Sequence, residues 1–299
     1  MGTVKKLDLK IGFLCNNRCK FCVQGDKRKK IGNKPFKKLV SEIKEARRDC
    51  EDIVFTGGEP TLRLDFFDLV KTAKKLGFKN IQIQTNGRLF AYKDFCRMAI
   101  EAGIKEFSLA IHGHRAELHD YLTSASGSFN ETLQGIKNLA SLGQIVCTNT
   151  VITKPNFRYL PEIVKLLAGI GIYQCQFSFV HITGRAAENK DIIVPRKSEV
   201  VPYVKKGLDI GIKAGIIMMT EAIPYCFLES YENNHVETII PLIRLHDADF
   251  VIDEYSHYRK TKGKSKGPQC FECKYYKICE GPWKEYPELF GWSEFKPIK

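Results

Sequence analysis

The sequence predicts an α/β fold of parallel strands, followed by a smaller irregular region toward the C-terminus. Five times the chain passes from a helix-like segment through glycine into a β-rich run, as in KKLGFKNIQIQ and LAGIGIYQCQFSF. Glycine at such a junction suits a left-handed helix C-cap. After about residue 215 this alternation stops, and proline, tyrosine and charged residues become frequent. Strands that alternate with helices form parallel sheets with right-handed crossovers.

The expected elements follow in order. The first two strands are LDLKIGFL, residues 7–14, and EDIVF, residues 51–55, and four more follow glycine junctions. Helices are expected near residues 35–48, 65–76, 92–101, 130–142, 158–170 and 198–214. Six strand–helix units fit an incomplete barrel of the triosephosphate-isomerase (TIM) type or an open doubly wound sheet, and both bind ligands at the carboxyl ends of their strands. We place a domain boundary between a core, 1–214, and an extension, 215–299.

Composition narrows the class of protein. The 299 residues, 43% of them hydrophobic, can bury a large core plus a small module, which excludes a peptide-sized scaffold. The sequence has no apolar run of membrane-span length and no signal peptide, so we expect a soluble, cytoplasmic protein. Eleven cysteines, partly in tight groups, favour metal chemistry in a reducing compartment over disulfides. The net charge of +13 indicates an anionic partner.

The first cysteine group is CNNRCKFC, residues 15–22, at the end of the first expected strand. Thiolates are soft ligands that select iron–sulfur clusters or zinc. A structural zinc site takes four ligands, and the next cysteine, Cys50, belongs to an expected helix. A four-iron cluster on Cys15, Cys19 and Cys22 would instead leave one iron open to an exogenous ligand, which is a catalytic arrangement.

A second motif, FTGGEPTL at residues 55–62, ends the second expected strand. Gly57 and Gly58 allow a ligand to approach the backbone closely. Glu59 supplies a carboxylate at the same edge of the sheet as the cysteines, and a carboxylate suits an amino group.

Together, Cys-x3-Cys-x2-Cys with Phe21 and Gly-Gly-Glu-Pro resemble the radical S-adenosylmethionine (SAM) superfamily over roughly residues 7–185. The resemblance implies a partial (β/α)6 TIM-type barrel and a [4Fe–4S] cluster on the three cysteines that chelates SAM. It implies an enzyme that cleaves SAM to a 5′-deoxyadenosyl radical, which abstracts a substrate hydrogen. Phe21 is then expected near adenine, and the strand end of Gly57, Gly58, Glu59 and Pro60 around the SAM amino group.

The resemblance extends to other strand ends. QTNG, residues 84–87, matches the family's third strand end, so Thr85 and Asn86 are expected SAM contacts. His181 falls where members contact adenine or ribose. Many members carry arginine where Thr123 stands, so the contact of the SAM carboxylate is not assigned. For His112, after the fourth strand, ordinary hydrogen bonding is the favoured role.

The extension holds Cys226, Cys270, Cys273 and Cys279. Four thiolates fit a zinc site or a fully ligated [4Fe–4S] cluster, and the Cys-x2-Cys-x5-Cys spacing by itself favours zinc slightly. In this context the segment resembles the twitch or SPASM extension of radical SAM enzymes that modify peptides, proteins and cofactor precursors. That resemblance implies one auxiliary [4Fe–4S] cluster, because the full SPASM form holds two clusters on more cysteines.

Basic residues gather at 27–38, KRKKIGNKPFKK, and at 259–266, RKTKGKSK, beside the two cysteine groups. They are either solvated loops or a positive rim that attracts an acidic peptide, a phosphorylated substrate or an acidic reductant such as flavodoxin or ferredoxin. The segment 258–268 is the one expected low-complexity loop.

The favoured function is a radical SAM enzyme that acts on a peptide or protein. The chain begins almost at the first strand, so a leader-peptide-binding protein would be a separate partner. One alternative is a small-molecule or cofactor-precursor substrate, such as a tetrapyrrole or a nucleotide. The non-enzyme alternative is an iron–sulfur electron-transfer protein or a zinc-stabilised nucleic-acid-binding protein.

Overall fold

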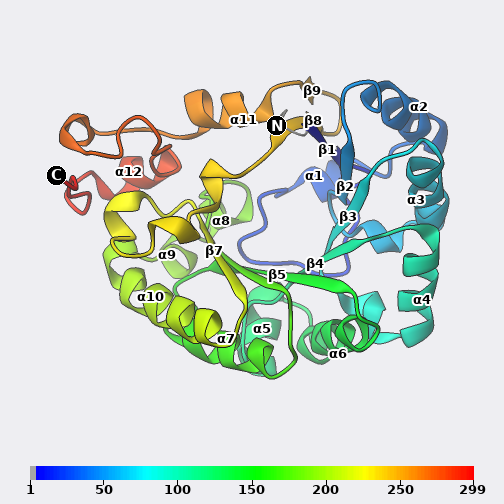
Figure 1. The fold of residues 1–299 in the computed structure, drawn as a ribbon, viewed down its shortest axis with the longest axis horizontal. Helices are drawn as coiled ribbons and strands as arrows, with labels where there is room; N and C mark the ends of the chain where they lie inside the picture. Colours follow the sequence, from blue (N-terminus) through cyan, green and yellow to red (C-terminus); the bar gives the residue numbers. More distant parts are fainter. Residues whose placement is uncertain (1–4) are drawn as a thin grey trace.

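A mostly parallel sheet organises residues 5–299, the part of the chain that the computed structural model describes. Its strands run in the order β7-β6-β5-β4-β3-β2-β1-β8-β9, and only β8 and β9 pair antiparallel. Because β7 and β9 are the two edges, the sheet curves without closing (Figure 1). The predicted α/β fold with an incomplete barrel is confirmed.

The strands are β1 (Lys5–Lys10), β2 (Asp52–Thr56), β3 (Asn80–Thr85), β4 (Glu106–Ala110), β5 (Ile145–Ile152), β6 (Gln174–Phe179), β7 (Ile217–Glu221), β8 (Leu242–His246) and β9 (Val251–Ile252). The helices are α1 (Lys27–Lys30), α2 (Phe36–Ala46), α3 (Phe66–Lys75), α4 (Lys93–Ala102), α5 (Ala116–Thr123), α6 (Ser128–Ser141), α7 (Leu160–Ala168), α8 (Arg185–Glu188), α9 (Lys190–Ile193), α10 (Lys197–Lys213), α11 (Tyr255–Tyr258) and α12 (Glu285–Phe290).

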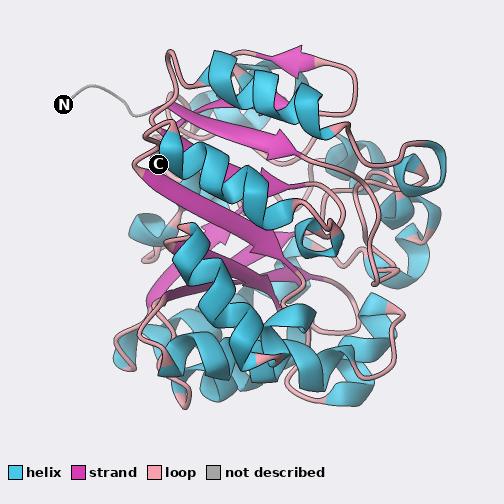
Figure 2. Cartoon of the chain, turned by 90° about the vertical axis from the view of Figure 1, so that its right-hand side faces the viewer, coloured by secondary structure: helices cyan, strands magenta, loops and turns pink. Residues whose placement is uncertain are grey.

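The longer helices lie outside the curved sheet (Figures 1 and 2). Side chains of a strand alternate between its two faces, and on β1 Leu7 and Leu9 are fully buried. The alternate residues Lys6 and Asp8 belong to the concave face, where Lys6 Nζ donates to Gln82 Oε1 of β3 (2.6 Å). The outer face therefore forms the apolar core with the helices, whereas the concave face is polar.

All six expected strands and six expected helices are present, but the sheet contains more than the sequence predicted. Residues 217–221, in the β-rich run after the fifth glycine junction, form β7 beside β6, and residues 242–246 form β8 beside β1. The sheet thus runs across residue 214, and the division into a core and an extension stays a prediction about function.

The segment 258–268 is not the low-complexity loop that we expected. It continues from α11 into a π-helical turn, Arg259–Gly263, and two of its cations are buried. Arg259 Nη2 donates to Glu280 Oε1 (2.8 Å), and Lys264 forms an ion pair with Glu237. Burying a charge without a partner is costly, so these pairs explain how Arg259 and Lys264 can lie in the interior. Lys260, Lys262 and Lys266 of the same stretch are exposed. In the described part of the chain, no helix has the length and apolar character to cross a membrane.

Candidate active site

The first cysteine group lies in the loop between β1 and α1, residues 11–26, here named the cysteine loop. Figure 1 shows this loop inside the arc of strands, at their carboxyl ends. The end of β2 binds its start, because Gly58 N donates to Gly12 O (2.8 Å) and Glu59 N donates to Leu14 O (2.7 Å).

The two glycines of Gly-Gly-Glu-Pro are required by this contact. A Cβ atom on Gly57 would lie 2.2 Å from Gly12 O, and one on Gly58 would lie 2.2 Å from Leu14 O. Gly57 also has a φ of +124°, which L side chains rarely adopt. The close neighbour of these glycines within the fold is therefore the backbone of the cysteine loop, and the approach of a ligand to them stays a prediction.

The three thiols are close enough to affect one another. Burial raises the pKa of Cys15 to about 11, with further contributions from Glu59 and Cys22. Burial also raises the pKa of Cys19, with further contributions from Cys22 and Cys15. Across residues 5–299, no three Cys, His, Asp or Glu side chains are arranged to hold a single metal ion. Three neighbouring soft donors in one loop fit the ligand set of an iron–sulfur cluster.

Glu59 joins the ends of β2 and β3. Its carboxylate is buried, and Oε1 accepts hydrogen bonds from Thr61 Oγ1 (2.6 Å) and Thr85 Oγ1 (2.7 Å). Oε2 accepts from Asn86 N (2.7 Å). Burial raises the pKa of Glu59, whereas these bonds lower it. Three of the expected SAM contacts, Glu59, Thr85 and Asn86, are thus brought together, with Pro60 beginning the short 3-10 helix after β2.

Asn86 connects this cluster to the cysteine loop. Its Nδ2 donates to Asn16 Oδ1 (2.6 Å) and lies 3.9 Å from Cys15 Sγ. The carboxyl ends of β2 and β3 therefore meet the first cysteine directly, as expected for neighbouring parallel strands.

Phe21 is buried among histidines rather than exposed. Its ring packs edge-on against His112, with centroids 4.7 Å apart. His112 N donates to His119 Nδ1 (3.1 Å), and Val151 N donates to His112 Nδ1 (3.3 Å). Burial lowers the pKa of His112 well below its usual value. His112 thus makes hydrogen bonds within the fold, and the choice between this role and a ligand contact stays a prediction.

Thr123, at the end of α5, contacts the cysteine loop. It is buried, and its carbonyl accepts a hydrogen bond from Arg18 N (2.7 Å). Its hydroxyl bonds to His119 O (2.9 Å). The position therefore anchors the cysteine loop and provides no positive charge for a carboxylate.

His181 contacts the extension. Its ring stacks on Trp283 with centroids 4.0 Å apart and planes 10° apart, and Nε2 lies 3.3 Å from Glu285 Oε2. Neither Trp283 nor Glu285 carries a sequence signal for this contact, because both lie about a hundred residues farther along the chain.

The basic segment 27–38 is only partly solvated. Lys27 Nζ binds Asp247 Oδ1 (2.7 Å), Arg28 donates to backbone carbonyls of the cysteine loop, and Lys34 is buried against Glu42. The exposed cations of the segment are Lys29, Lys30, Lys37 and Lys38. Only these four remain candidates for attracting a partner, which corrects the interpretation of the whole segment as one loop.

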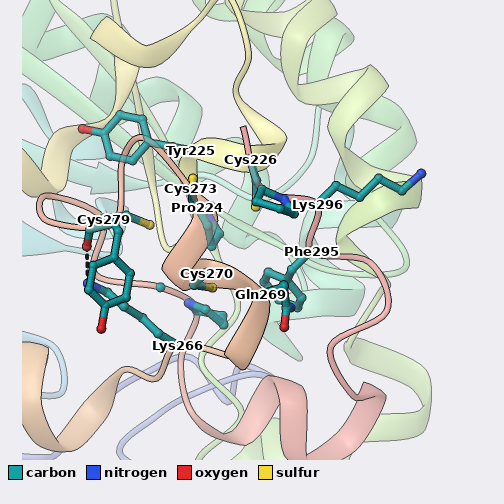
Figure 3. Close-up of a pocket in the computed structure, with 14 residues that line it drawn as sticks. Pro224, Tyr225, Cys226, Lys266, Gln269, Cys270, Cys273, Cys279, Phe295 and Lys296 are labelled. Atoms are coloured by element: carbon teal, nitrogen blue, oxygen red, sulfur yellow. Dashed lines mark hydrogen bonds between the residues drawn. The ribbon is translucent and has the colours of Figure 1, made fainter. Parts of the chain in front are cut away.

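The second cysteine group surrounds one pocket (Figure 3). Cys226 lies in a short turn after β7, and the other three lie between residues 270 and 279. The pocket is partly open to solvent, and its other lining residues include Pro224, Tyr225, Lys266, Tyr276, Phe295 and Lys296. Burial raises the pKa of Cys226 to about 12, with further contributions from Cys279, Cys270 and Cys273. These four thiols therefore face a common space.

Comparison with known proteins gives the family. Residues 9–167 match the model of the Radical SAM superfamily. An AdoMet-dependent heme synthase of Oleidesulfovibrio alaskensis is 31% identical over 183 residues, which are 58% of this chain and 45% of that protein. A probable GTP 3′,8-cyclase of Saccharolobus islandicus is 27% identical over 184 residues, 60% of this chain and 58% of that protein. The chain thus spans about half the length of these curated relatives.

Solved structures resemble the chain over nearly its whole length. Streptococcus suis SuiB bound to precursor peptide SuiA has a TM-score of 0.71 at 16% identity, covering 94% of this chain and 72% of that one. Native anSMEcpe with bound AdoMet has a TM-score of 0.69 at 16% identity, covering 94% and 89%. At this identity the likeness shows the fold alone. From the family match, which includes the cysteine loop and Gly-Gly-Glu-Pro, the chain belongs to the radical SAM superfamily and is an enzyme.

Proposed function

We propose that this radical SAM enzyme modifies a peptide or protein, and that its extension holds one auxiliary [4Fe–4S] cluster. The family implies a [4Fe–4S] cluster and SAM, which when bound together supply a 5′-deoxyadenosyl radical. The observation that carries the proposal is the pocket shared by Cys226, Cys270, Cys273 and Cys279. Four thiolates complete the ligand set of a closed [4Fe–4S] cluster.

In the core, Cys15, Cys19 and Cys22 hold the catalytic cluster in this proposal. The strand end Gly57–Pro60 binds the SAM amino group, with the Glu59 carboxylate as its partner in a charge-assisted hydrogen bond. Glu59 is already oriented by Thr85 and Asn86, so it would lose little freedom on binding. Asn86 is proposed to contact SAM on the side of Cys15. Phe21 is proposed to contact it on the side of His112.

His181 is proposed as a contact of adenine or ribose, although its ring now has a defined partner. Its ring stacks on Trp283 and lies near Glu285, so the extension sets the orientation of His181. The core, 1–214, and the extension, 215–299, are thus proposed as functional units that share this aromatic contact.

The peptide substrate is supported by the extent of the structural likeness. SuiB, described with a bound precursor peptide, and anSMEcpe, described with a bound peptide, resemble 94% and 93% of this chain, which includes most of the extension. An acidic reductant such as flavodoxin or ferredoxin and a separate leader-peptide-binding protein are the partners that this proposal implies.

A small-molecule substrate is the second candidate, because the curated relatives include a heme synthase and a probable GTP cyclase. Their similarity covers 58% and 60% of the chain, about the length of the barrel. A tetrapyrrole or a nucleotide is therefore the alternative to test.

Anaerobically reconstituted, dithionite-reduced enzyme should be incubated with SAM and with candidate peptides, GTP or a tetrapyrrole. We expect a peptide substrate to increase 5′-deoxyadenosine formation and to change in mass. If only GTP or the tetrapyrrole does so, the substrate class is wrong while the radical SAM chemistry stands. Zinc in place of iron in the extension would contradict the auxiliary cluster.

A further inference from the structure

Five successive carbonyl groups of the cysteine loop, from Cys15 to Cys19, each accept a hydrogen bond from an arginine side chain. Arg28 donates through Nη2 to Cys15 O (2.8 Å) and through Nη1 to Asn17 O (2.6 Å). Arg88 Nη1 donates to Asn16 O (2.8 Å). Arg185 Nη1 donates to Arg18 O and to Cys19 O (3.3 Å for Cys19).

These arginines come from three separate parts of the fold. Arg28 lies in α1, Arg88 follows β3, and Arg185 begins α8 after β6. Each reaches the loop from a different strand end. We name Arg28, Arg88 and Arg185 the arginine clamp.

Only one of the three clamp arginines is paired with a carboxylate. Arg88 forms an ion pair with Glu131. Within residues 5–299, neither the Arg28 nor the Arg185 guanidinium forms an ion pair, and both side chains are only partly exposed. The carboxylate of Asp26 lies near Arg185, but its ion pair is with Lys29. Two half-buried positive charges therefore lie against the loop that carries Cys15, Cys19 and Cys22. Desolvation of a guanidinium without an anionic partner is unfavourable, so this arrangement calls for a negative charge nearby.

An iron–sulfur cluster on three thiolates supplies such a charge. Its reduction potential depends on net charge, on hydrogen bonds and on solvent exposure. A nearby cation stabilises the reduced form more than the oxidised form, because reduction adds one negative charge, and partial burial weakens solvent screening.

We infer that Arg28 and Arg185 are positioning residues that fix the cysteine loop and raise the reduction potential of the catalytic cluster. In the step that they favour, one electron passes from a one-electron donor protein to the cluster. The donor is oxidised by one electron and the cluster is reduced by one. The inference rests on the proposed ligation by Cys15, Cys19 and Cys22, and Arg88 shares only the fixing role because its charge is paired.

The test is a redox titration of reconstituted holoenzyme without SAM, followed by electron paramagnetic resonance. A parallel sample with SAM identifies the signal of the catalytic cluster, as the one that SAM changes. Arg28→Gln and Arg185→Gln are each expected to lower the potential by about 59 mV, which corresponds to a tenfold change in the one-electron equilibrium. Arg97→Gln, at an exposed pair with Asp94 on α4, is the control and should keep the wild-type potential.

Arg28→Lys separates charge from geometry. Lysine keeps the positive charge but cannot reproduce the two-pronged contact with Cys15 O and Asn17 O. We expect Arg28→Lys to keep the potential near wild type and to release iron to a chelator faster. A shift as large as that of Arg28→Gln would overturn the role of charge.

The inference fails if both glutamine variants contain full iron and titrate like wild type. If Arg28→Gln does not retain iron, the potential of Arg185→Gln tests the inference instead. This variant should keep its loop in place, because the hydrogen bond from Arg185 N to Cys22 O (3.0 Å) does not depend on the side chain. Wild-type protein that binds no iron at these cysteines would instead refute the proposed ligation, so the two failures can be distinguished.

Discussion

The two cysteine groups are held in different ways. In the cysteine loop, polar contacts dominate: the arginine clamp binds the carbonyls, and backbone groups at the end of β2 bind residues 12 and 14. In the extension, aromatic packing is combined with buried ion pairs, such as that of Lys264 with Glu237. Tyr225 is stacked between His235 and Tyr275, with centroids 4.4 and 4.5 Å away.

This contrast fits the roles that we propose for the two groups. A cluster that leaves one iron open has only three protein ligands, so its loop needs other contacts to keep its shape. In the proposed auxiliary site, four thiolates around one pocket would complete a closed ligand set by themselves, and the surrounding rings would exclude water. The contrast predicts that the first group is sensitive to its neighbours, whereas the second depends mainly on its own cysteines.

The largest expected effect comes from removing the first group. A Cys15/Cys19/Cys22→Ala variant should form no 5′-deoxyadenosine from SAM. It should keep about four irons per chain, the content of one [4Fe–4S] cluster. Iron analysis and electron paramagnetic resonance check this, and the remaining signal should not respond to SAM.

The opposite variant is the matched control. Cys226→Ser with Cys273→Ser should lose the iron of the extension and retain substrate-free cleavage of SAM. Stoichiometric zinc and no iron in the alanine variant would instead assign the second group to zinc. A remaining iron signal that shifts with a peptide would indicate a cluster open to substrate.

The next effect is on cofactor affinity. A charge-assisted hydrogen bond contributes about 1.5–3 kcal/mol, so Glu59→Gln should weaken SAM binding by roughly tenfold or more. Iron content should stay unchanged, and equilibrium binding of SAM to the reconstituted enzyme measures the loss.

Thr61→Val is the control for Glu59. It removes the hydrogen bond from Thr61 Oγ1 to Glu59 Oε1 but leaves the carboxylate and its contacts with Thr85 and Asn86. A loss of SAM affinity in Thr61→Val as large as that in Glu59→Gln would mean that Glu59 acts by orienting the strand ends.

The sequence predicted the features that arise locally or from the strand order. Each glycine junction lies within one strand–helix unit, so six strands could be located. Thr85 and Asn86 were expected near SAM from the resemblance of QTNG to the family's third strand end, and the fold brings them to Glu59 because the carboxyl ends of neighbouring parallel strands meet. β8 could not be placed, because all five of its residues pair with β1, more than two hundred residues away, and only two pair with the nearby β9.

The arginine clamp shows why part of the site escaped prediction. Arg28 stands in a run of lysines that is typical of a solvated surface, yet its guanidinium reaches the cysteine loop. Arg88 and Arg185 carry no motif, and their shared target appears only when β3 and β6 are placed around one loop. Charge counts locate basic residues in the sequence but not the partners that each one meets in the fold.

A smaller effect, on stability, is expected from the ion pairs that connect the extension to the core. Asp247, after β8, is buried and binds Lys10 and Lys27, the second of which precedes the clamp residue Arg28. Burial raises the pKa of Asp247, but the bonds from Lys10 and Lys27 outweigh it and lower the pKa from 3.8 to about 2. The carboxylate therefore contributes stability above pH 4, which is lost as the pH falls toward 2.

Asp247→Asn should accordingly lower the free energy of unfolding by about 2 kcal/mol. Between pH 5 and 8 the difference in unfolding free energy between variant and wild type should be constant. The pKa of Asp247 lies below that range in both the folded and the unfolded chain. Urea unfolding measures it. Asp253→Asn, which removes the exposed partner of Arg244, should cost less than about 1 kcal/mol. Equal losses in the two variants would contradict a special role for Asp247.

The smallest effect should come from the exposed cations near the cysteine loop. Reversing Lys29, Lys30, Lys37 and Lys38 to Glu should slow association with an acidic partner, such as a flavodoxin, by roughly tenfold at low ionic strength. Added salt should slow the wild type in the same direction, because these charges are screened over about 10 Å at 0.1 M salt. Stopped-flow association rates measure both effects.

A matched variant reverses four exposed lysines on the outer helices, Lys71, Lys75, Lys93 and Lys137. It changes the net charge equally but leaves the side of the cysteine loop unaltered. If both variants slow association equally, overall charge rather than this basic segment attracts the partner. If neither salt nor either variant alters the association rate, the four lysines form an ordinary solvated surface. An acidic partner would then have to be attracted by another site.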